Sequence, residues 1–218
     1  MAIHIKRPSD IKPSDITPKS VYLDRRKFMK HTLATSVLLA TDAMLPAWAK
    51  MWPDLAESKY STKDTPNTFE DITTYNNFYE FGTSKSDPAQ NAGSLVTSPW
   101  SVAIEGEVEK PVTYHFEDLV RSSKLEERIY RHRCVEAWSM VIPWNGFSLR
   151  NLIARFRPTS RAKYVEFTTL LRPSEMPGQR GDVLPWPYVE GLRMDEAMHP
   201  LTMVVTGLYG RPLPNQVA

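Results

Sequence analysis

Short runs in which apolar and polar residues alternate make up most of the chain, and they predict a strand-rich domain. Residues 100–108 and 112–116 alternate with a period of two, which is the pattern of a half-buried strand. Residues 125–130, 164–171 and 201–209 are expected to form further strands.

One stretch has the periodicity of a helix instead. Its apolar residues are spaced i, i+3, i+4 and i+7, and Ser148 precedes them as a candidate N-cap; they are Leu149, Leu152, Ile153 and Phe156. Residues 117–121 and 194–198 predict short helical turns, whereas 50–74 is expected to be an irregular N-terminal arm and 87–98 a loop. Few helices among many short strands favour a β-rich α+β fold.

The charge of the chain is unevenly distributed. The 218 residues carry 27 basic and 25 acidic side chains, a net charge of +2. Residues 1–49 hold eight of the basic and four of the acidic side chains, so the remaining 169 residues hold 19 and 21. The part expected to fold is therefore slightly acidic, and a nucleic-acid-binding function is not expected.

The first 49 residues have the three parts of an export signal. The paired arginines Arg25 and Arg26 precede an uncharged stretch at 32–41, and Ala47-Trp48-Ala49 forms a small-residue cleavage site. Because Asp42 and Pro46 end the apolar stretch early, it is too short for a transmembrane anchor. Paired arginines indicate the twin-arginine variant, so we predict a signal peptide over residues 1–49 and a mature protein in the periplasm.

The chain has one cysteine, Cys134, which excludes an internal disulfide or a Cys-cluster metal site. Arg131, His132 and Arg133 precede it, and cationic neighbours favour the thiolate, the form that attacks substrates or binds metals. In a strand, the two arginines would share one face and His132 and Cys134 the other. From the residues alone, a buried inert thiol, a thiol nucleophile and a metal thiolate all stay open.

Three long blocks resemble the MsrP family, the catalytic subunits of periplasmic protein-methionine-sulfoxide reductases. They are YNNFYEFG at 75–82, RHRCVEAWSMVIPWNGFSLRNLI at 131–153 and PYVEGLRMDEAMHPLT at 187–202. The resemblance implies a sulfite-oxidase-like fold over residues 75–218, with one molybdenum–molybdopterin cofactor. Matched residue by residue, Cys134 is expected to be the thiolate ligand of molybdenum. Contacts to the pterin are expected from Asn76, Tyr79 and Glu80 in the aromatic loop and from Thr169 in the strand at 164–171.

The implied activity is reductive oxygen-atom transfer, which returns methionine sulfoxide in oxidised periplasmic proteins to methionine. A sulfoxide is a polar, chiral lesion that disrupts protein cores, so its repair restores packing. Electrons are expected from the membrane haem-binding subunit MsrQ, with this chain as a monomer in that two-subunit system. Arg131 and Arg133 are candidates for holding anionic groups or for surface salt bridges, and Trp138, Trp144 and Trp186 for a substrate groove or for core packing.

The end of the chain departs from the family pattern. Val217 stands where the family has a cofactor-binding asparagine, and the arginine and Gly-Ile-Lys segments that serve the cofactor phosphate do not follow. We interpret the sequence as C-terminally truncated. Two alternatives stay open beside the reductase: an inactive remnant that cannot retain cofactor, and a metal-free thiol enzyme that uses Cys134.

Overall fold

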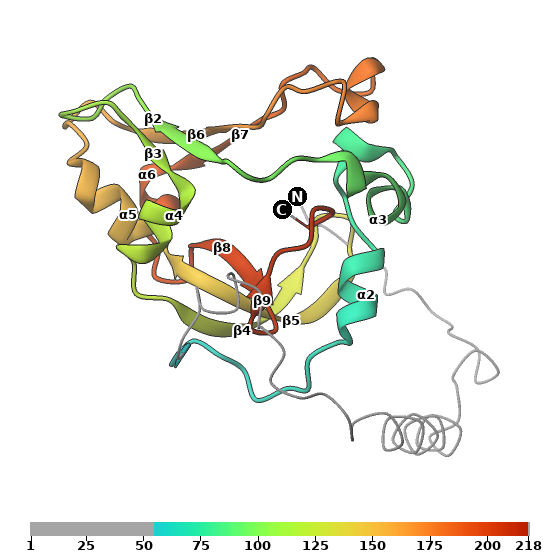
Figure 1. Cartoon of the computed structure of the whole chain (residues 1–218). Coiled ribbons are helices and arrows are strands. Elements are labelled where there is room, and N and C mark those ends of the chain that lie inside the picture. Colours follow the sequence, from blue (N-terminus) through green and yellow to red (C-terminus); the bar gives the residue numbers. More distant parts are fainter. Residues whose placement is uncertain (1–54, 218) are drawn as a thin grey trace, which may run out of the picture. The chain divides into compact units, whose positions relative to one another are not determined.

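The computed structural model describes residues 55–217, and its main feature is a five-stranded sheet (Figure 1). The expected signal peptide and the start of the expected arm lie outside the described residues. The strand order is β1-β4-β5-β8-β9; the strands span Ala56–Glu57, Glu126–Arg133, Ser139–Ser148, Met203–Leu208 and Arg211–Pro212. β1 pairs with β4 in parallel, and the other three pairs are antiparallel.

Two smaller antiparallel sheets accompany the main one. β2 (Ser101–Ile104) pairs with β3 (Val112–His115), and β6 (Tyr164–Thr168) pairs with β7 (Val189–Arg193). The helices are short; they are α2 (Phe69–Thr74), α3 (Asp87–Asn91), α4 (Phe116–Arg121), α5 (Leu149–Phe156) and α6 (Met194–Ala197), with 3-10 turns η3 (Tyr79–Phe81), η4 (Ala92–Ser94) and η5 (Pro177–Arg180). This strand-rich mixture confirms the α+β prediction.

The predicted amphipathic helix is confirmed by α5. Its four apolar residues are all buried in one cluster with Phe147, Leu119, Val120 and Ala197, against which the small sheets pack. Ser148 occupies the N-cap position, but its side chain makes no capping hydrogen bond. Met194 and Met198 pack on the same cluster, and Met176 is buried in a second one beside Phe81.

Several segments are more regular than the pattern predicts. Residues 55–74 contain β1 and α2, and α2 begins with a capping box in which Thr68 and Asp71 exchange hydrogen bonds. Ile72 on this helix is only 2% exposed and joins a third core cluster with Ile142 and Leu208. The segment at 87–98 contains α3 and η4 rather than a simple loop. Among the residues that the structure describes, no helix has the length and apolar character needed to cross a membrane.

The ten-residue strand β5 was not predicted, because Pro143 and Gly146 argue against a central strand. The structure accommodates both. The Pro143 carbonyl accepts a hydrogen bond from the Tyr209 backbone N–H at 3.2 Å, and the register with β8 shifts at Asn145 and Gly146. A Cβ at Gly146 would lie 2.0 Å from the Val204 carbonyl oxygen, so the close pairing of β5 with β8 requires glycine there.

Candidate active site

Cys134 is the first residue after β4 and lies at the mouth of the β4–β5 hairpin. The strands pair up to Arg133 and Ser139, and residues 134–138 form the turn. The Cys134 N–H donates to the Trp138 carbonyl at 3.0 Å, and the Cys134 carbonyl accepts from the Ala137 N–H at 3.0 Å. Ala137 adopts a left-handed φ of 75° to close the turn. The backbone of the cysteine is thus fixed on both sides, with its thiol half-buried.

The predicted alternation along the end of β4 is confirmed. Arg131 and Arg133 are exposed, while His132 and Cys134 are partly buried. Arg131 forms an ion pair with Asp64, with Nε–Oδ2 and Nη2–Oδ1 distances of 2.5 and 3.2 Å. Because both partners are largely exposed, this pair contributes little to stability. The salt-bridge reading of Arg131 therefore holds.

The histidines at 115, 132 and 199 each have structural surroundings of their own. Burial lowers the pKa of His132, which favours its neutral form, and its ring packs 5.7 Å from Trp138 and 6.4 Å from Trp144. His115 is the exposed N-cap residue of α4, and His199 Nδ1 accepts from the Leu201 N–H at 3.2 Å. Within residues 55–217, no group of three or more His, Cys, Asp or Glu could hold a metal ion.

A network of polar side chains reaches the thiol through Asn77. Asn77 Nδ2 lies 3.5 Å from Cys134 Sγ, and Lys85 Nζ donates to Asn77 Oδ1. The same ammonium lies 2.5 Å from Glu136 Oε2, which also accepts from Trp138 Nε1 at 2.9 Å. The Glu136 carboxylate holds the pKa of Lys85 above its usual value, so Lys85 stays charged. Asn77 and Lys85 were not predicted as site residues, because neither carries a signal of its own in the sequence.

The aromatic loop that contains Asn77 also holds the other predicted cofactor contacts. The Asn76 backbone N–H donates to the Lys85 carbonyl at 3.0 Å, and its Nδ2 donates to the Ile72 carbonyl at 2.9 Å. Asn76 Oδ1 is buried and has no hydrogen-bond partner among the described residues. Tyr79 is half-buried, whereas Glu80 is 5% exposed.

Thr169 approaches the same loop from the end of β6. Its backbone N–H donates to the Tyr188 carbonyl at 2.9 Å, while its hydroxyl oxygen is buried without a partner among the described residues. Burial raises the pKa of the Glu80 carboxyl; the nearby Thr169 hydroxyl opposes the shift without reaching hydrogen-bonding geometry. Two orphaned buried oxygens at predicted cofactor positions, Asn76 and Thr169, are thus available to a polar ligand.

The structure therefore places the predicted residues in two neighbouring groups that the aromatic loop connects. Asn77 links the start of the aromatic loop to Cys134, and Glu80 at the end of that loop faces Thr169. Within residues 55–217, no hydrogen bond joins Cys134 to Tyr79, Glu80 or Thr169. A metal bound to a single protein thiolate needs its other ligands from elsewhere, and a metal–pterin cofactor brings them. The donor set fits that cofactor.

The segment around η5 packs against the aromatic loop and holds the chain that follows Thr169. Gly178 lies against the loop so closely that a Cβ would be 2.1 Å from the Tyr79 carbonyl oxygen. Gln179, 6% exposed, accepts from the Arg172 N–H at 2.8 Å and donates to the Leu170 carbonyl at 2.6 Å. These contacts fix the chain that leaves Thr169. In Figure 1 the orange segment with η5 lies beside the segment that carries α3.

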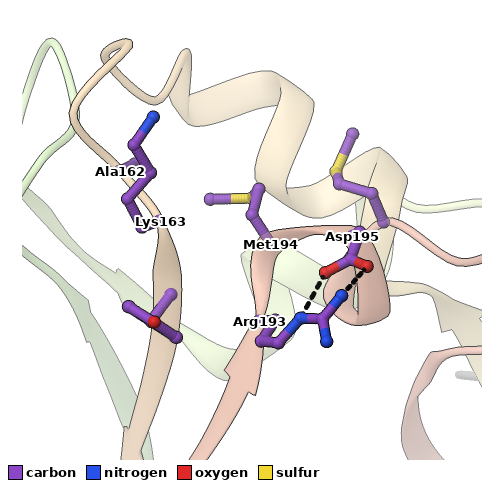
Figure 2. Close-up of a pocket in the computed structure, with 7 residues that line it drawn as sticks. Ala162, Lys163, Arg193, Met194 and Asp195 are labelled. Atoms are coloured by element: carbon purple, nitrogen blue, oxygen red, sulfur yellow. Dashed lines mark hydrogen bonds and ion pairs between the residues drawn. The ribbon is translucent and has the colours of Figure 1, made fainter.

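A separate hollow lies away from these residues. Figure 2 shows it beside the start of β6, the end of β7 and the start of α6, with the Arg193–Asp195 ion pair at its rim. Lys163, Met194 and Met198 line it, and it contains none of the predicted site residues.

Trp186, which the sequence offered as a candidate for a substrate groove, donates from Nε1 to the Gly181 carbonyl at 2.8 Å within its own loop.

Comparison with known proteins identifies the family. The model of the oxidoreductase molybdopterin binding domain matches residues 90–217. The MsrP catalytic subunit of protein-methionine-sulfoxide reductase from Pseudomonas syringae pv. tomato is 49% identical over 240 residues, covering 99% of this chain and 70% of that protein. The chain belongs to the MsrP family. The MsrP of Xanthomonas campestris is 52% identical, over 97% of this chain and 66% of its own length.

The MsrP of Burkholderia mallei is 50% identical, over 95% of this chain and 65% of its own length. The chain thus spans 65 to 70% of the length of these MsrP relatives. Among solved structures, the sulfane dehydrogenase SoxCD of Paracoccus pantotrophus matches with a TM-score of 0.50 and 17% identity, over 84% of this chain and 49% of that one. This likeness confirms the sulfite-oxidase-like fold.

Gly178→Ala is expected to lower the free energy of unfolding by about 1–3 kcal/mol, because the new methyl group must displace the Tyr79 carbonyl. Gly93→Ala is the control, since nothing lies within 4 Å of its Cβ position. Urea unfolding of the two variants measures the difference. Equal stabilities would show that the loop does not depend on this close approach.

The burial of Glu80 predicts that the free energy of unfolding depends on pH. Since burial raises its pKa in the folded state, the protonated form stabilises the fold below the unfolded pKa of about 4.3, and this stability is lost as pH rises through the folded pKa. Glu80→Gln should therefore unfold with a higher free energy than the unmodified chain at neutral pH and with an equal one in acid. Urea unfolding of cofactor-free protein tests this, with the exposed Glu105→Gln as control. A less stable Glu80→Gln variant at neutral pH would contradict it.

Proposed function

We propose that this chain binds a molybdenum–molybdopterin cofactor and reduces methionine sulfoxide in proteins. The observation that carries the proposal is a pair of buried oxygens that have no hydrogen-bond partner among the described residues. They are Asn76 Oδ1, next to the Asn77 that contacts Cys134, and Thr169 Oγ1, which lies near Glu80. Membership of the MsrP family supports the same assignment. The activity named for those relatives belongs to longer proteins, so it is proposed for this chain.

Each side chain has a distinct part in holding the cofactor. Cys134 would supply the thiolate to the metal, a soft ligand that suits a transition metal. Asn76 Oδ1 would accept a hydrogen bond from the pterin and the Thr169 hydroxyl could donate or accept one. Tyr79 and Glu80 would complete the contacts from η3, and Gly178 would keep that turn in place.

When bound, the cofactor supplies the two-electron chemistry that converts a sulfoxide and two protons to a thioether and water. The chain contributes access and position. Val135, next to Cys134 in the hairpin turn, is fully exposed at 101%, so the turn is open to a methionine side chain presented on a protein surface. His132, whose neutral form burial favours, packs behind the turn against two tryptophans.

The cellular setting is part of the same proposal. The paired arginines Arg25 and Arg26 and the small-residue site at 47–49 support export by the twin-arginine pathway to the periplasm. Substrates would be oxidised periplasmic proteins. The membrane haem-binding subunit MsrQ would deliver electrons, since the relatives are named catalytic subunits and that name implies a partner subunit.

The decisive experiment measures molybdenum in protein purified from molybdate-replete cells, together with reduction of an oxidised protein by a viologen donor. We expect near-stoichiometric molybdenum in the unmodified chain. In Cys134→Ser, molybdenum content and sulfoxide reduction should both fall at least about tenfold, because losing a metal ligand has a larger effect than losing a residue that only hydrogen-bonds to a ligand. Ser139→Ala, at the other side of the hairpin, is the matched control. Metal-free protein that cannot reduce sulfoxide would support the remnant alternative. Activity that survives a block in molybdopterin synthesis would support the thiol enzyme.

Thr169→Val separates a ligand-binding role from a structural one. Because the Thr169 hydroxyl is buried without a hydrogen-bond partner in residues 55–217, its removal should leave the free energy of unfolding of the cofactor-free chain equal or up to about 1 kcal/mol higher. Molybdenum occupancy should fall. Thr73→Val is the control: its hydroxyl donates to the Phe69 carbonyl at 2.9 Å, and its loss should cost about 1 kcal/mol without affecting occupancy. Unchanged occupancy in Thr169→Val would contradict the role.

A further inference from the structure

In the contact between Asn77 and Cys134, the orientation of the Asn77 carboxamide is fixed by a neighbouring residue. A carboxamide can present either its oxygen or its NH₂ group to a neighbour, and the two ends are easily interchanged by rotation. Lys85 removes this ambiguity, because an ammonium group donates hydrogen bonds and never accepts them. Its Nζ donates to Asn77 Oδ1, so the NH₂ end must face Cys134 Sγ, 3.5 Å away.

Lys85 is in turn held in place by the hairpin turn itself. Glu136 Oε2 accepts from Lys85 at 2.5 Å and from the Trp138 indole at 2.9 Å. The ammonium also lies 5.9 Å from the centre of the Tyr75 ring, which packs edge-on against Trp138. The side chains of Lys85 and Glu136 are 28% and 33% exposed, so the pair is partly shielded from water. Lys85 therefore connects the aromatic loop to the turn that bears the thiol.

We propose that Asn77 and Lys85 form a positioning pair that directs an N–H donor at the sulfur of Cys134 and so tunes the metal that it binds. An N–H···S hydrogen bond withdraws electron density from a metal-bound thiolate and raises the reduction potential of the centre. The assignment of the metal rests on the proposed function. The hydrogen bond and its orientation rest on the geometry of the chain alone.

The charge arrangement favours this role over simple loop packing. Glu136 compensates the charge of Lys85 without touching the sulfur in any hydrogen bond among the described residues, so the thiolate meets a neutral donor rather than a cation. A neutral N–H can tune a ligand without competing with the metal for it. Lys59 also lies over an aromatic ring, 5.2 Å from the centre of Tyr60, and no hydrogen bond or ion pair among the described residues joins it to this network.

The first arm of the test uses the full chain without cofactor and observes the side-chain amide of Asn77 by NMR, assigned by its loss in Asn77→Leu. Cys134→Ala should shift this signal, and so should Lys85→Met, because the amide is then free to rotate. The Asn91 side chain, which donates to the Phe81 carbonyl at 2.8 Å, serves as the internal control and should not move. An Asn77 signal that is unchanged by Cys134→Ala overturns the hydrogen bond.

The second arm uses the molybdenum-loaded protein and measures metal occupancy, reduction potential and the sulfur-to-metal charge-transfer band. Asn77→Leu and Asn77→Asp should lower the potential and shift the band, with occupancy or activity reduced roughly tenfold. Lys85→Met should act in the same direction and Lys85→Arg should restore the values, whereas Lys59→Met should match the unmodified chain. An unchanged potential and band in folded Asn77→Leu overturn the tuning.

The two arms separate this inference from the proposed function. If the unmodified chain binds no molybdenum, the proposed function fails, and the NMR arm alone decides whether Asn77 donates to Cys134. If it binds molybdenum and Asn77→Leu behaves as the unmodified chain does, the reductase assignment stands and the positioning pair is wrong. Should Asn77→Leu fail to fold, Lys85→Met and its Lys85→Arg rescue provide the same decision.

Discussion

The pairing of β4 with β5 is the interaction on which the candidate site depends. It runs in unbroken antiparallel register from Glu126 opposite Gly146 to Arg133 opposite Ser139, so the position of Cys134 at the turn follows from the whole length of the hairpin. A shift of one residue would exchange the two faces of β4. His132 and Cys134 would then lie with solvent, and Arg131 and Arg133 with the site.

The constraint at the other side of the site is the close packing of η5 on η3. Gly178 lets two backbones approach to a distance that no side chain permits, and Gln179 satisfies the backbone on either side of the approach. Burial of Glu80 follows from this packing, and its raised pKa is the cost of removing a carboxyl group from water. The described part of the fold thus contains two buried polar oxygens, on Asn76 and Thr169, that its own residues do not satisfy, which is characteristic of a binding site rather than of a core.

The local patterns of the sequence predicted what periodicity and composition control. The apolar spacing of α5, the alternation at Arg131–Cys134 and the strand-rich class follow from rules that act over a few residues. β5 was missed because the rule against proline and glycine in strands was overridden by tertiary pairing with β4 and β8. Helix α2 was missed because its six residues are too few to show a period, and its capping box was the available signal.

The candidate site shows the same division. The resemblance to the MsrP family named Cys134, Asn76, Tyr79, Glu80 and Thr169, whereas Asn77, Lys85 and Gly178 emerge only from contacts between distant segments. A lysine eight residues from an asparagine does not indicate a functional role in the sequence. It acquires one when Asn77 reaches a thiol 57 positions away and Lys85 bonds to that asparagine, because a group that can only donate then decides which end of the amide meets the sulfur. The chemistry of this site is therefore set by orientation as much as by residue type, and orientation is a property of the fold.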